Sequence, residues 1–278
     1  MAGTSIGEAL ARGSRELAPV SETAGRDVQV LLAEMMCRPR EWLLAHPEAP
    51  VPCEINDQFA SALQRLTAGE PLSYVLGWCE FFGRRFTVIP EVLIPRPETE
   101  LLVQRGLEAI DRHPRARAII DVGTGSGCVG ITLALERRRA RVVAADISRA
   151  ALSVARGNAE KLGAGAMVAF VMADLTQGMS LEDAVVLATL PYVASGEVGD
   201  LRCEPRLALD GGDRGMDVIR RMLQQLASRR PCRTTVLLEI GAGQGNAAID
   251  LASRLCHPTR AWVEPDLAVH DRILGLEF

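Results

Sequence analysis

The sequence is poor in the residues that build metal sites and disulfide scaffolds. It has four histidines, none in an H-x-x-x-H pair, and seven cysteines that are dispersed with no C-x-x-C pair. Zinc sites need such clusters, and disulfide frameworks need cysteines in regular pairs. We therefore expect no metal site, and we expect reduced thiols in a cytoplasmic protein.

Long apolar runs and clustered positive charge are also missing. No uncharged apolar run approaches 18 residues, and the first twenty residues lack the basic and apolar regions of a signal peptide, so no membrane segment is expected. The net charge is −4, and thirty arginines, with Lys161 as the only lysine, are spread along the chain. This spread argues against nucleic acid as a partner. Codon bias of a GC-rich genome explains the excess of arginine over lysine.

The residues that are present predict a small helical domain followed by a larger α/β domain. Through the first seventy residues, apolar side chains recur at helical spacing, and prolines divide the stretch into short helices. Aromatic and β-branched residues with interspersed glycines then predict a β-hairpin. The predicted boundaries are residues 1–70 for the helical domain, 71–97 for the hairpin linker and 98–278 for the α/β domain.

The α/β domain is predicted from short apolar runs that alternate with helical stretches. Strands that are apolar on both faces and alternate with helices indicate a mostly parallel sheet covered on both sides. The predicted strands are AIIDV (118–122), RVVAAD (141–146), MVAFVMAD (167–174), AVVLA (184–188) and TTVLLEI (234–240).

A glycine loop and two acids indicate a nucleoside-binding edge of this sheet. D-V-G-T-G-S-G, residues 121–127, follows a strand and opens a helix, where backbone N–H groups can face a ligand. Asp146 and Asp174 end the next two strands, placed to reach a ribose and an adenine amino group. Taken singly, the loop could be only a tight turn and each acid a helix cap. The spacing D-x-G-x-G-x-G resembles motif I of class I S-adenosylmethionine-dependent methyltransferases, whereas NAD sites use G-x-G-x-x-G.

Five further segments carry family-specific motifs: residues 69–83, 92–103, 204–217, 237–245 and 266–275. Together they resemble the HemK/PrmC family. Members of this family are N5-glutamine methyltransferases that modify the Gly-Gly-Gln motif of peptide-chain release factors. The resemblance implies a class I methyltransferase (Rossmann-like) fold with a seven-stranded, mostly parallel sheet. Residues 1–70 would then bind substrate, and residues 98–278 would bind S-adenosylmethionine.

The resemblance also implies roles for individual residues. The loop should wrap the amino-acid part of the cofactor, Asp146 with Ile147 should hold the ribose, and Asp174 with Leu175 should flank the adenine. Arg96 and Glu98 should lie at the mouth of the pocket; alternatively, Arg96 forms a salt bridge to Glu98 or Glu100. The loop residues are Gly123, Thr124, Gly125, Ser126 and Gly127.

One motif departs from the family pattern. Where the family has Asn-Pro-Pro-Tyr, this chain has Thr189, Leu190, Pro191 and Tyr192. In the family, the Asn side chain and the following carbonyl accept hydrogen bonds from the substrate amide. Thr189 is shorter than Asn, and Leu190 lacks the ring that fixes φ. Losing one preorganised polar contact costs roughly 10²–10³ in rate in other enzymes.

From this departure we expect an enzyme recruited to a small-molecule substrate, in natural-product biosynthesis. An SN2 transfer from the sulfonium would release S-adenosylhomocysteine, or the same geometry would serve ring closure such as cyclopropanation. Thr189, also beside the cofactor, and Tyr192 would be the catalytic residues. Both would also contact substrate, together with Arg96, Glu98, Leu190 and Pro191. The alternative role of Tyr192 is core packing. The alternative functions are glutamine methylation of a release factor and a non-catalytic cofactor-binding scaffold.

Overall fold

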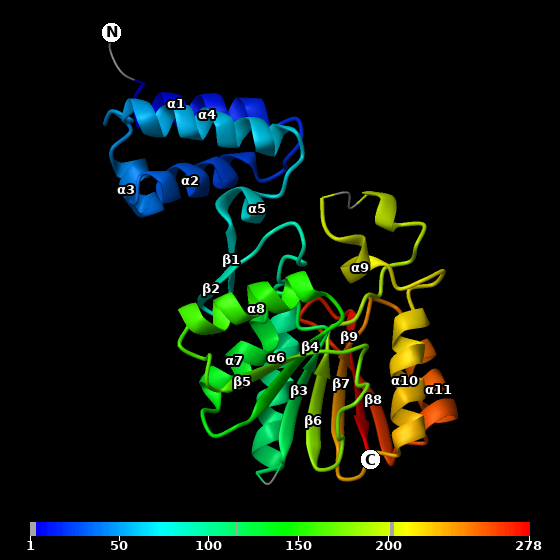
Figure 1. Cartoon of the computed structure of the whole chain (residues 1–278). Coiled ribbons are helices and arrows are strands. Elements are labelled where there is room, and N and C mark those ends of the chain that lie inside the picture. The colour runs from blue at the N-terminus through cyan, green and yellow to red at the C-terminus, as the bar shows by residue number, and fades with distance from the viewer. Residues whose placement is uncertain (1–3, 115, 201–202) are drawn as a thin grey trace. The chain divides into compact units, whose positions relative to one another are not determined.

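The computed structural model describes residues 4–114, 116–200 and 203–278 and divides into two compact units (Figure 1). The first unit is Met1–Trp78 and the second is Cys79–Phe278. Each unit has its own hydrophobic core, because one cluster of buried side chains lies in the first and two lie in the second. The chain therefore buries its apolar surface in two separate places.

The first unit consists of five helices around a small core. They are α1 (Ile6–Leu17), α2 (Ala24–Met35), α3 (Arg40–Ala45), α4 (Cys53–Thr67) and α5 (Leu72–Leu76). Ser5 and Glu8 form a capping box at the start of α1. A proline directly precedes α3, α4 and α5, where its fixed φ suits a helix entry. The fully buried core side chains include Ile6, Leu31, Leu32, Phe59 and Leu63.

The stretch 71–97, predicted as a hairpin linker, contains three kinds of structure. Leu72–Leu76 is helical, and the hairpin consists of β1 (Trp78–Phe81) and β2 (Arg84–Thr87). Phe82 and Gly83 both have positive φ, as a two-residue turn between twisted strands requires. Residues 88–97 form an irregular segment that leads to the next helix.

The second unit contains a seven-stranded sheet in the order β5-β4-β3-β6-β7-β9-β8. Neighbouring strands are parallel except that β9 runs antiparallel to β7 and β8. This confirms the predicted fold class. The strands are β3 (Ala118–Val122), β4 (Val142–Asp146), β5 (Val168–Met172), β6 (Ala184–Ala188), β7 (Thr235–Glu239), β8 (Arg260–Pro265) and β9 (Asp271–Glu277).

Helices cover both faces of the sheet (Figure 1). On one face, α6 (Thr99–Arg112), α7 (Cys128–Glu136) and α8 (Arg149–Lys161) pack on the strands, and on the other, α10 (Asp217–Arg229) and α11 (Gly245–Cys256) do so. In β6, Val185 and Leu187 point into the first core while Val186 points into the second. This double burial explains why β6 reads as an uninterrupted apolar run.

The carboxyl ends of β3, β4, β6 and β7 meet at one edge of the sheet, because these strands are parallel and in register. Loops leave each strand there, and the segment between β6 and α10 includes the short helix α9 (Arg206–Leu209). Crevices at this edge are where α/β sheets bind ligands. This edge therefore holds the candidate site.

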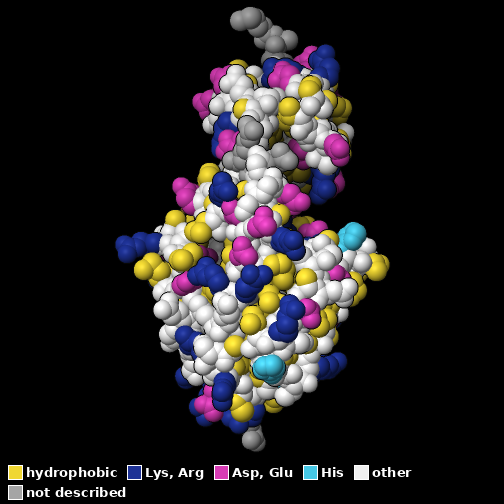
Figure 2. Space-filling model, turned by 90° about the vertical axis from the view of Figure 1, so that its right-hand side faces the viewer, with side chains coloured by type: hydrophobic (Ala, Val, Ile, Leu, Met, Phe, Trp, Pro, Cys, Tyr) yellow, Lys and Arg dark blue, Asp and Glu magenta, His cyan; other side chains and the backbone are white. Residues whose placement is uncertain are grey.

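Acidic and basic side chains are intermixed over the face of the molecule that Figure 2 presents. Within the described ranges, no helix has the length and apolar character needed to cross a membrane. The same residues contain no group of three or more His, Cys, Asp or Glu that could hold a metal ion.

Candidate functional site

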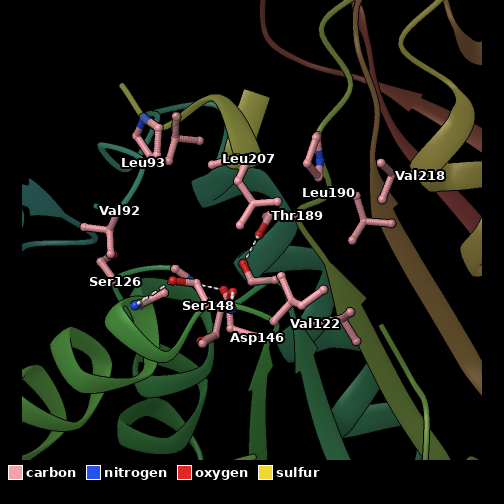
Figure 3. Close-up of a pocket in the computed structure, with 18 of the residues that line it drawn as sticks. Val92, Leu93, Val122, Ser126, Asp146, Ser148, Thr189, Leu190, Leu207 and Val218 are labelled. Atoms are coloured by element: carbon pink, nitrogen blue, oxygen red, sulfur yellow. Dashed lines mark hydrogen bonds between the residues drawn. The ribbon is translucent and has the colours of Figure 1, made fainter. Parts of the chain in front are cut away.

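A cavity of about 580 Å³ opens at the carboxyl edge of the sheet, within the second unit (Figure 3). Its volume falls in the range of small-molecule and cofactor pockets. Three of the predicted site residues, Glu98, Gly127 and Tyr192, are not part of its lining. The predicted residues that do line it are Arg96, Gly123, Thr124, Gly125, Ser126, Asp146, Ile147, Asp174, Leu175, Thr189, Leu190 and Pro191.

The glycine loop between β3 and α7 forms the floor of the cavity and requires glycine for two separate reasons. Gly123 has φ +73°, and a Cβ there would lie 2.5 Å from the carbonyl oxygen of Thr189. Gly127 has φ +85°, and its Cβ would lie 2.6 Å from Ile131 Cδ1. The first glycine allows the loop to approach the end of β6, and the second allows α7 to begin. The loop thus presents its backbone directly to the cavity.

Asp121 lies buried under this loop. Its Oδ2 accepts hydrogen bonds from Thr124 Oγ1 at 2.6 Å and from the Gly130 N–H at 2.9 Å. Among the described atoms its Oδ1 has no hydrogen-bond partner. Complete burial raises the pKa of Asp121 to about 6, although the two hydrogen bonds oppose the shift. Asp121 therefore fixes the shape of the loop from below.

Asp146 ends β4 and faces the cavity from beside the glycine loop (Figure 3). Its two oxygens accept hydrogen bonds from the Gly125 N–H at 2.9 Å and the Ser148 N–H at 2.8 Å. Burial raises the pKa of the carboxyl, and the backbone donors pull it back down. An ionised carboxylate has about four acceptor positions, so it can accept from ligand hydroxyl groups as well as from these backbone donors. This geometry fits the recognition of a ribose.

Asp174, after β5, also lines the cavity, but it has a partner that the sequence did not reveal. Its Oδ2 forms an ion pair with Arg221 of α10, which lines the cavity as well. Leu175 follows with φ +56° and a buried side chain. Asp174 and Leu175, which were predicted to flank the adenine, therefore line the cavity together with Arg221.

Thr189 follows β6 and faces the glycine loop (Figure 3). Its backbone N–H donates to the Val122 carbonyl at 3.1 Å, and its hydroxyl donates to the Gly123 carbonyl at 3.0 Å. Leu190 is 4% exposed and packs in the second core of this unit. Thr189 is therefore held by hydrogen bonds to the loop after β3, and Leu190 is held by the burial of its side chain.

Tyr192 points away from the cavity toward the end of β7. Its hydroxyl donates to Glu239 Oε1 at 3.1 Å, and its carbonyl accepts from Gln244 Nε2 at 3.0 Å. Glu239 Oε2 accepts a second hydroxyl, that of Thr99, at 2.7 Å. Burial raises the pKa of Tyr192 and that of Glu239. Tyr192 is therefore held in place behind the residues that line the cavity.

Arg96 lies in the segment before α6 and forms an ion pair with Glu204. The other Glu204 oxygen accepts the Ile94 N–H at 3.1 Å. The Glu204 side chain is 7% exposed, so a buried acid connects the 91–96 segment to the segment before α9. The expected partners lie elsewhere, because Glu98 is exposed at the start of α6 and Glu100 accepts the Phe82 N–H.

Four residues that organise the site were not predicted from the sequence: Asp121 as a buried support, Glu204, Arg221 and Glu239. A signal existed for Glu239, because an acid inside the apolar run TTVLLEI has to be buried with partners. Glu204 and Arg221 carried no comparable signal, since their partners are more than 40 residues away in the chain.

Two protein families match separate parts of the chain. The family described as PrmC N-terminal domain matches residues 8–77, and the family described as methyltransferase domain matches residues 114–201. Release factor glutamine methyltransferases are similar over nearly the whole length. The protein of that name from Moorella thermoacetica is 40% identical over 95% of both chains. The one from Bordetella pertussis is 36% identical over 90% of this chain and 93% of its own length.

Solved structures with a similar fold include two of human METTL16. The METTL16 catalytic domain in complex with a MAT2A 3′UTR hairpin aligns with a TM-score of 0.58 at 15% identity, covering 80% of this chain and 82% of that one. The METTL16 N-terminal domain in complex with SAH aligns with a TM-score of 0.51 at 13% identity, over 84% and 86%. At such identities the likeness supports the fold alone.

These comparisons confirm part of the sequence interpretation and contradict another part. The chain is an S-adenosylmethionine-dependent methyltransferase, and S-adenosylmethionine is its cofactor. The expectation of a recruited enzyme with a small-molecule partner in natural-product biosynthesis is wrong, because full-length relatives at 35–40% identity are release factor glutamine methyltransferases. The change at two loop positions does not outweigh a similarity that spans nearly the whole chain.

Proposed function

Since the chain belongs to the HemK/PrmC family of release factor glutamine methyltransferases, we propose that it methylates the side-chain amide nitrogen of a glutamine in a peptide-chain release factor. The observation that carries this proposal is the similarity over 95% of the chain to such an enzyme, with the PrmC N-terminal domain matched at residues 8–77. Both the catalytic unit and the accessory helical unit of the relatives are thus represented.

The chemistry places a specific demand on the cavity. An amide nitrogen is a weak nucleophile because its lone pair is delocalised, so the enzyme has to orient it. When bound, S-adenosylmethionine supplies an electrophilic methyl carbon on a sulfonium centre. Asp146 and the glycine loop are suited to hold that cofactor, and the Thr189–Pro191 segment lines the same cavity. The amide would lie between these two groups of residues.

Thr189 is suited to accept a hydrogen bond from the amide. A hydroxyl has one proton to donate and two lone pairs that accept. The Thr189 proton is directed to the Gly123 carbonyl at 3.0 Å, so toward the cavity the oxygen can only accept. An acceptor next to the amide N–H₂ favours the orientation that turns the nitrogen lone pair to the methyl group. In this proposal Thr189 takes the role that the family assigns to Asn.

Leu190 is suited to hold its carbonyl in place without a proline ring. A residue before proline is confined to extended conformations, and Leu190 precedes Pro191. Its side chain is buried in the core, which removes the freedom that an exposed leucine would have. Burial and the following proline together replace the constraint that the family obtains from its first proline.

A cytoplasmic location is part of the proposal. The thiols of Cys37, Cys53, Cys128, Cys232 and Cys256 are free, which fits a reducing compartment.

The direct test uses labelled S-adenosylmethionine and a purified bacterial release factor. We expect one methyl group per release factor, and peptide mass spectrometry should place it on the glutamine of the Gly-Gly-Gln motif. The matched control is the same release factor with that glutamine replaced by glutamate, which keeps the shape and removes the amide. Equal labelling of both proteins, or no labelling of the first, would overturn the proposal.

A further inference from the structure

The described residues contain a buried carboxylate whose two hydroxyl partners belong to two different walls of the site. Glu239, the last residue of β7, is 3% exposed. Tyr192 Oη donates to its Oε1 at 3.1 Å and Thr99 Oγ1 donates to its Oε2 at 2.7 Å. A carboxylate buried this deeply costs free energy unless hydrogen bonds compensate it, and both partners serve that purpose.

The two partners reach the cavity by separate routes. Thr99 is the first residue of α6 and lines the cavity itself. Tyr192 does not line the cavity, but it directly follows Pro191, which does. The Tyr192 carbonyl is also held, because Gln244 Nε2 donates to it at 3.0 Å. Gln244 Oε1 in turn accepts the Gly241 N–H at 2.8 Å. The end of β7, through Glu239, and the segment after it, through Gln244, therefore hold Tyr192 at two points.

We propose that Glu239 is a positioning residue of the methyl-transfer site, which sets the 189–192 loop and the start of α6 against each other by accepting a hydrogen bond from Tyr192 and one from Thr99. The proposal rests on the proposed glutamine methylation and adds a residue that acts through others rather than on the substrate. It follows that Tyr192 contributes through its hydroxyl and carbonyl contacts and not by stacking on the substrate.

Ionisation of Glu239 matters for this arrangement. The ionised carboxylate accepts a charge-assisted hydrogen bond from each hydroxyl, whereas protonation removes the charge and weakens both contacts. Burial raises the pKa of Glu239 and the nearby Glu98 raises it further, while Thr99, Tyr192 and Arg272 lower it. The buried Cys128 thiol also lies within electrostatic range. We therefore expect kcat to fall at acid pH as Glu239 becomes protonated.

The test compares Glu239→Gln with the wild type in release-factor methylation. A misplacement of reacting groups by about 1 Å costs roughly 10²-fold in rate, so we expect kcat to fall by about 100-fold. The dissociation constant for S-adenosylmethionine, measured by calorimetry, should stay within about threefold, because Glu239 does not line the cavity. The fall of kcat at acid pH that protonation of Glu239 causes in the wild type should be absent in Glu239→Gln.

Tyr192→Phe provides a second variant. It removes the hydrogen bond from the Tyr192 hydroxyl to Glu239 and places no new hydrogen-bond donor beside that carboxylate. Its loss in kcat should not add to that of Glu239→Gln in the double variant, because both remove the same contact. Glu264→Gln is the matched control: Glu264 also lies on a strand, accepts from Trp262 Nε1 at 2.8 Å and pairs with Arg105 of α6, but it neither lines the cavity nor contacts the 189–192 loop.

Four outcomes are informative. Wild-type kcat in Glu239→Gln, or losses that add fully in the double variant, would overturn the positioning role. An equal loss of cofactor affinity in Glu239→Gln would also overturn it, because the effect would then be a general loosening of the cavity. A wild-type protein that methylates no release factor would instead defeat the proposed function, which the other three outcomes leave intact.

Discussion

Thr189 contributes one hydroxyl to the cavity, and the proton of that hydroxyl is directed to the Gly123 carbonyl at 3.0 Å. Its oxygen lies one bond from Cβ, whereas a carboxamide oxygen lies two bonds away. A substrate amide held by Thr189 therefore has to approach the end of β6 more closely than one held by Asn. Gly123 permits the close approach of the two loops on which the hydrogen bond from Thr189 depends.

If Thr189 is the acceptor, its hydroxyl should matter more than its methyl group. We predict that Thr189→Val, which keeps the shape, lowers kcat for release-factor methylation by about 100-fold, as loss of a preorganised polar contact does elsewhere. Thr189→Ser should retain activity within about threefold of the wild type. Steady-state kinetics with calorimetric cofactor binding measure both effects. A Thr189→Val variant with wild-type kcat would show that the loop carbonyls alone orient the amide.

At the residue scale, the sequence restricts a position most strongly where backbone chemistry leaves few alternatives. Gly123 and Asp146 were predicted at the site because a positive φ and a strand-end carboxylate have few substitutes, and both line the cavity. Tyr192 was predicted as a catalytic residue, but its ring turns toward Glu239. The direction of a side chain depends on partners such as Glu239 and Gln244, which local sequence does not specify.

At the scale of elements, two segments far apart in the chain form the upper wall of the cavity. Residues 91–96 and the region around α9 both contribute lining side chains. Glu204 joins them through its ion pair with Arg96 and its contact with the Ile94 N–H at 3.1 Å. Residues 91–96 belong to no helix or strand, so this one acid contributes much of their order.

We predict that Glu204→Ala weakens S-adenosylmethionine binding by about tenfold, since hydrogen bonds to charged groups contribute about 1.5–3 kcal/mol and water partly replaces them at the half-exposed Arg96. Calorimetric titration measures the dissociation constant. Glu136→Ala is the control, because Glu136 forms a comparable ion pair with Arg84 away from the cavity. Equal affinities of the two variants would show that the 91–96 segment is ordered without Glu204.

The strands illustrate what periodicity can and cannot predict. The predicted runs 118–122 and 184–188 coincide with β3 and β6, because strands buried on both faces read as short apolar runs. β8 and β9 were not located individually. Their residues are mixed in character, as in Arg260–Pro265, where the strand is only partly buried. The helix α5 lay within a stretch predicted as hairpin, because Pro71 and the apolar residues after it fit either structure.

At the scale of the whole molecule, two units with separate cores are joined by a continuous chain. The first unit buries the helices α1 to α4 around Leu31 and Phe59, and the second buries its sheet between two layers of helices. All lining residues of the cavity belong to the second unit. Ligand binding should therefore stabilise one core directly and leave the other to its own interactions.

We predict two transitions in differential scanning calorimetry, of which only one shifts when cofactor is added. At a free concentration 100 times the dissociation constant, S-adenosylmethionine should raise the free energy of unfolding of the second unit by about 2.7 kcal/mol. Hydrogen exchange identifies the transition: the amides of β3, β4 and β6 should gain protection with cofactor, whereas those of α1, α2 and α4 should not. If the molecule instead unfolds in one transition that moves as a whole, the two cores are thermodynamically coupled, and the helical unit contributes to the stability of the cofactor site.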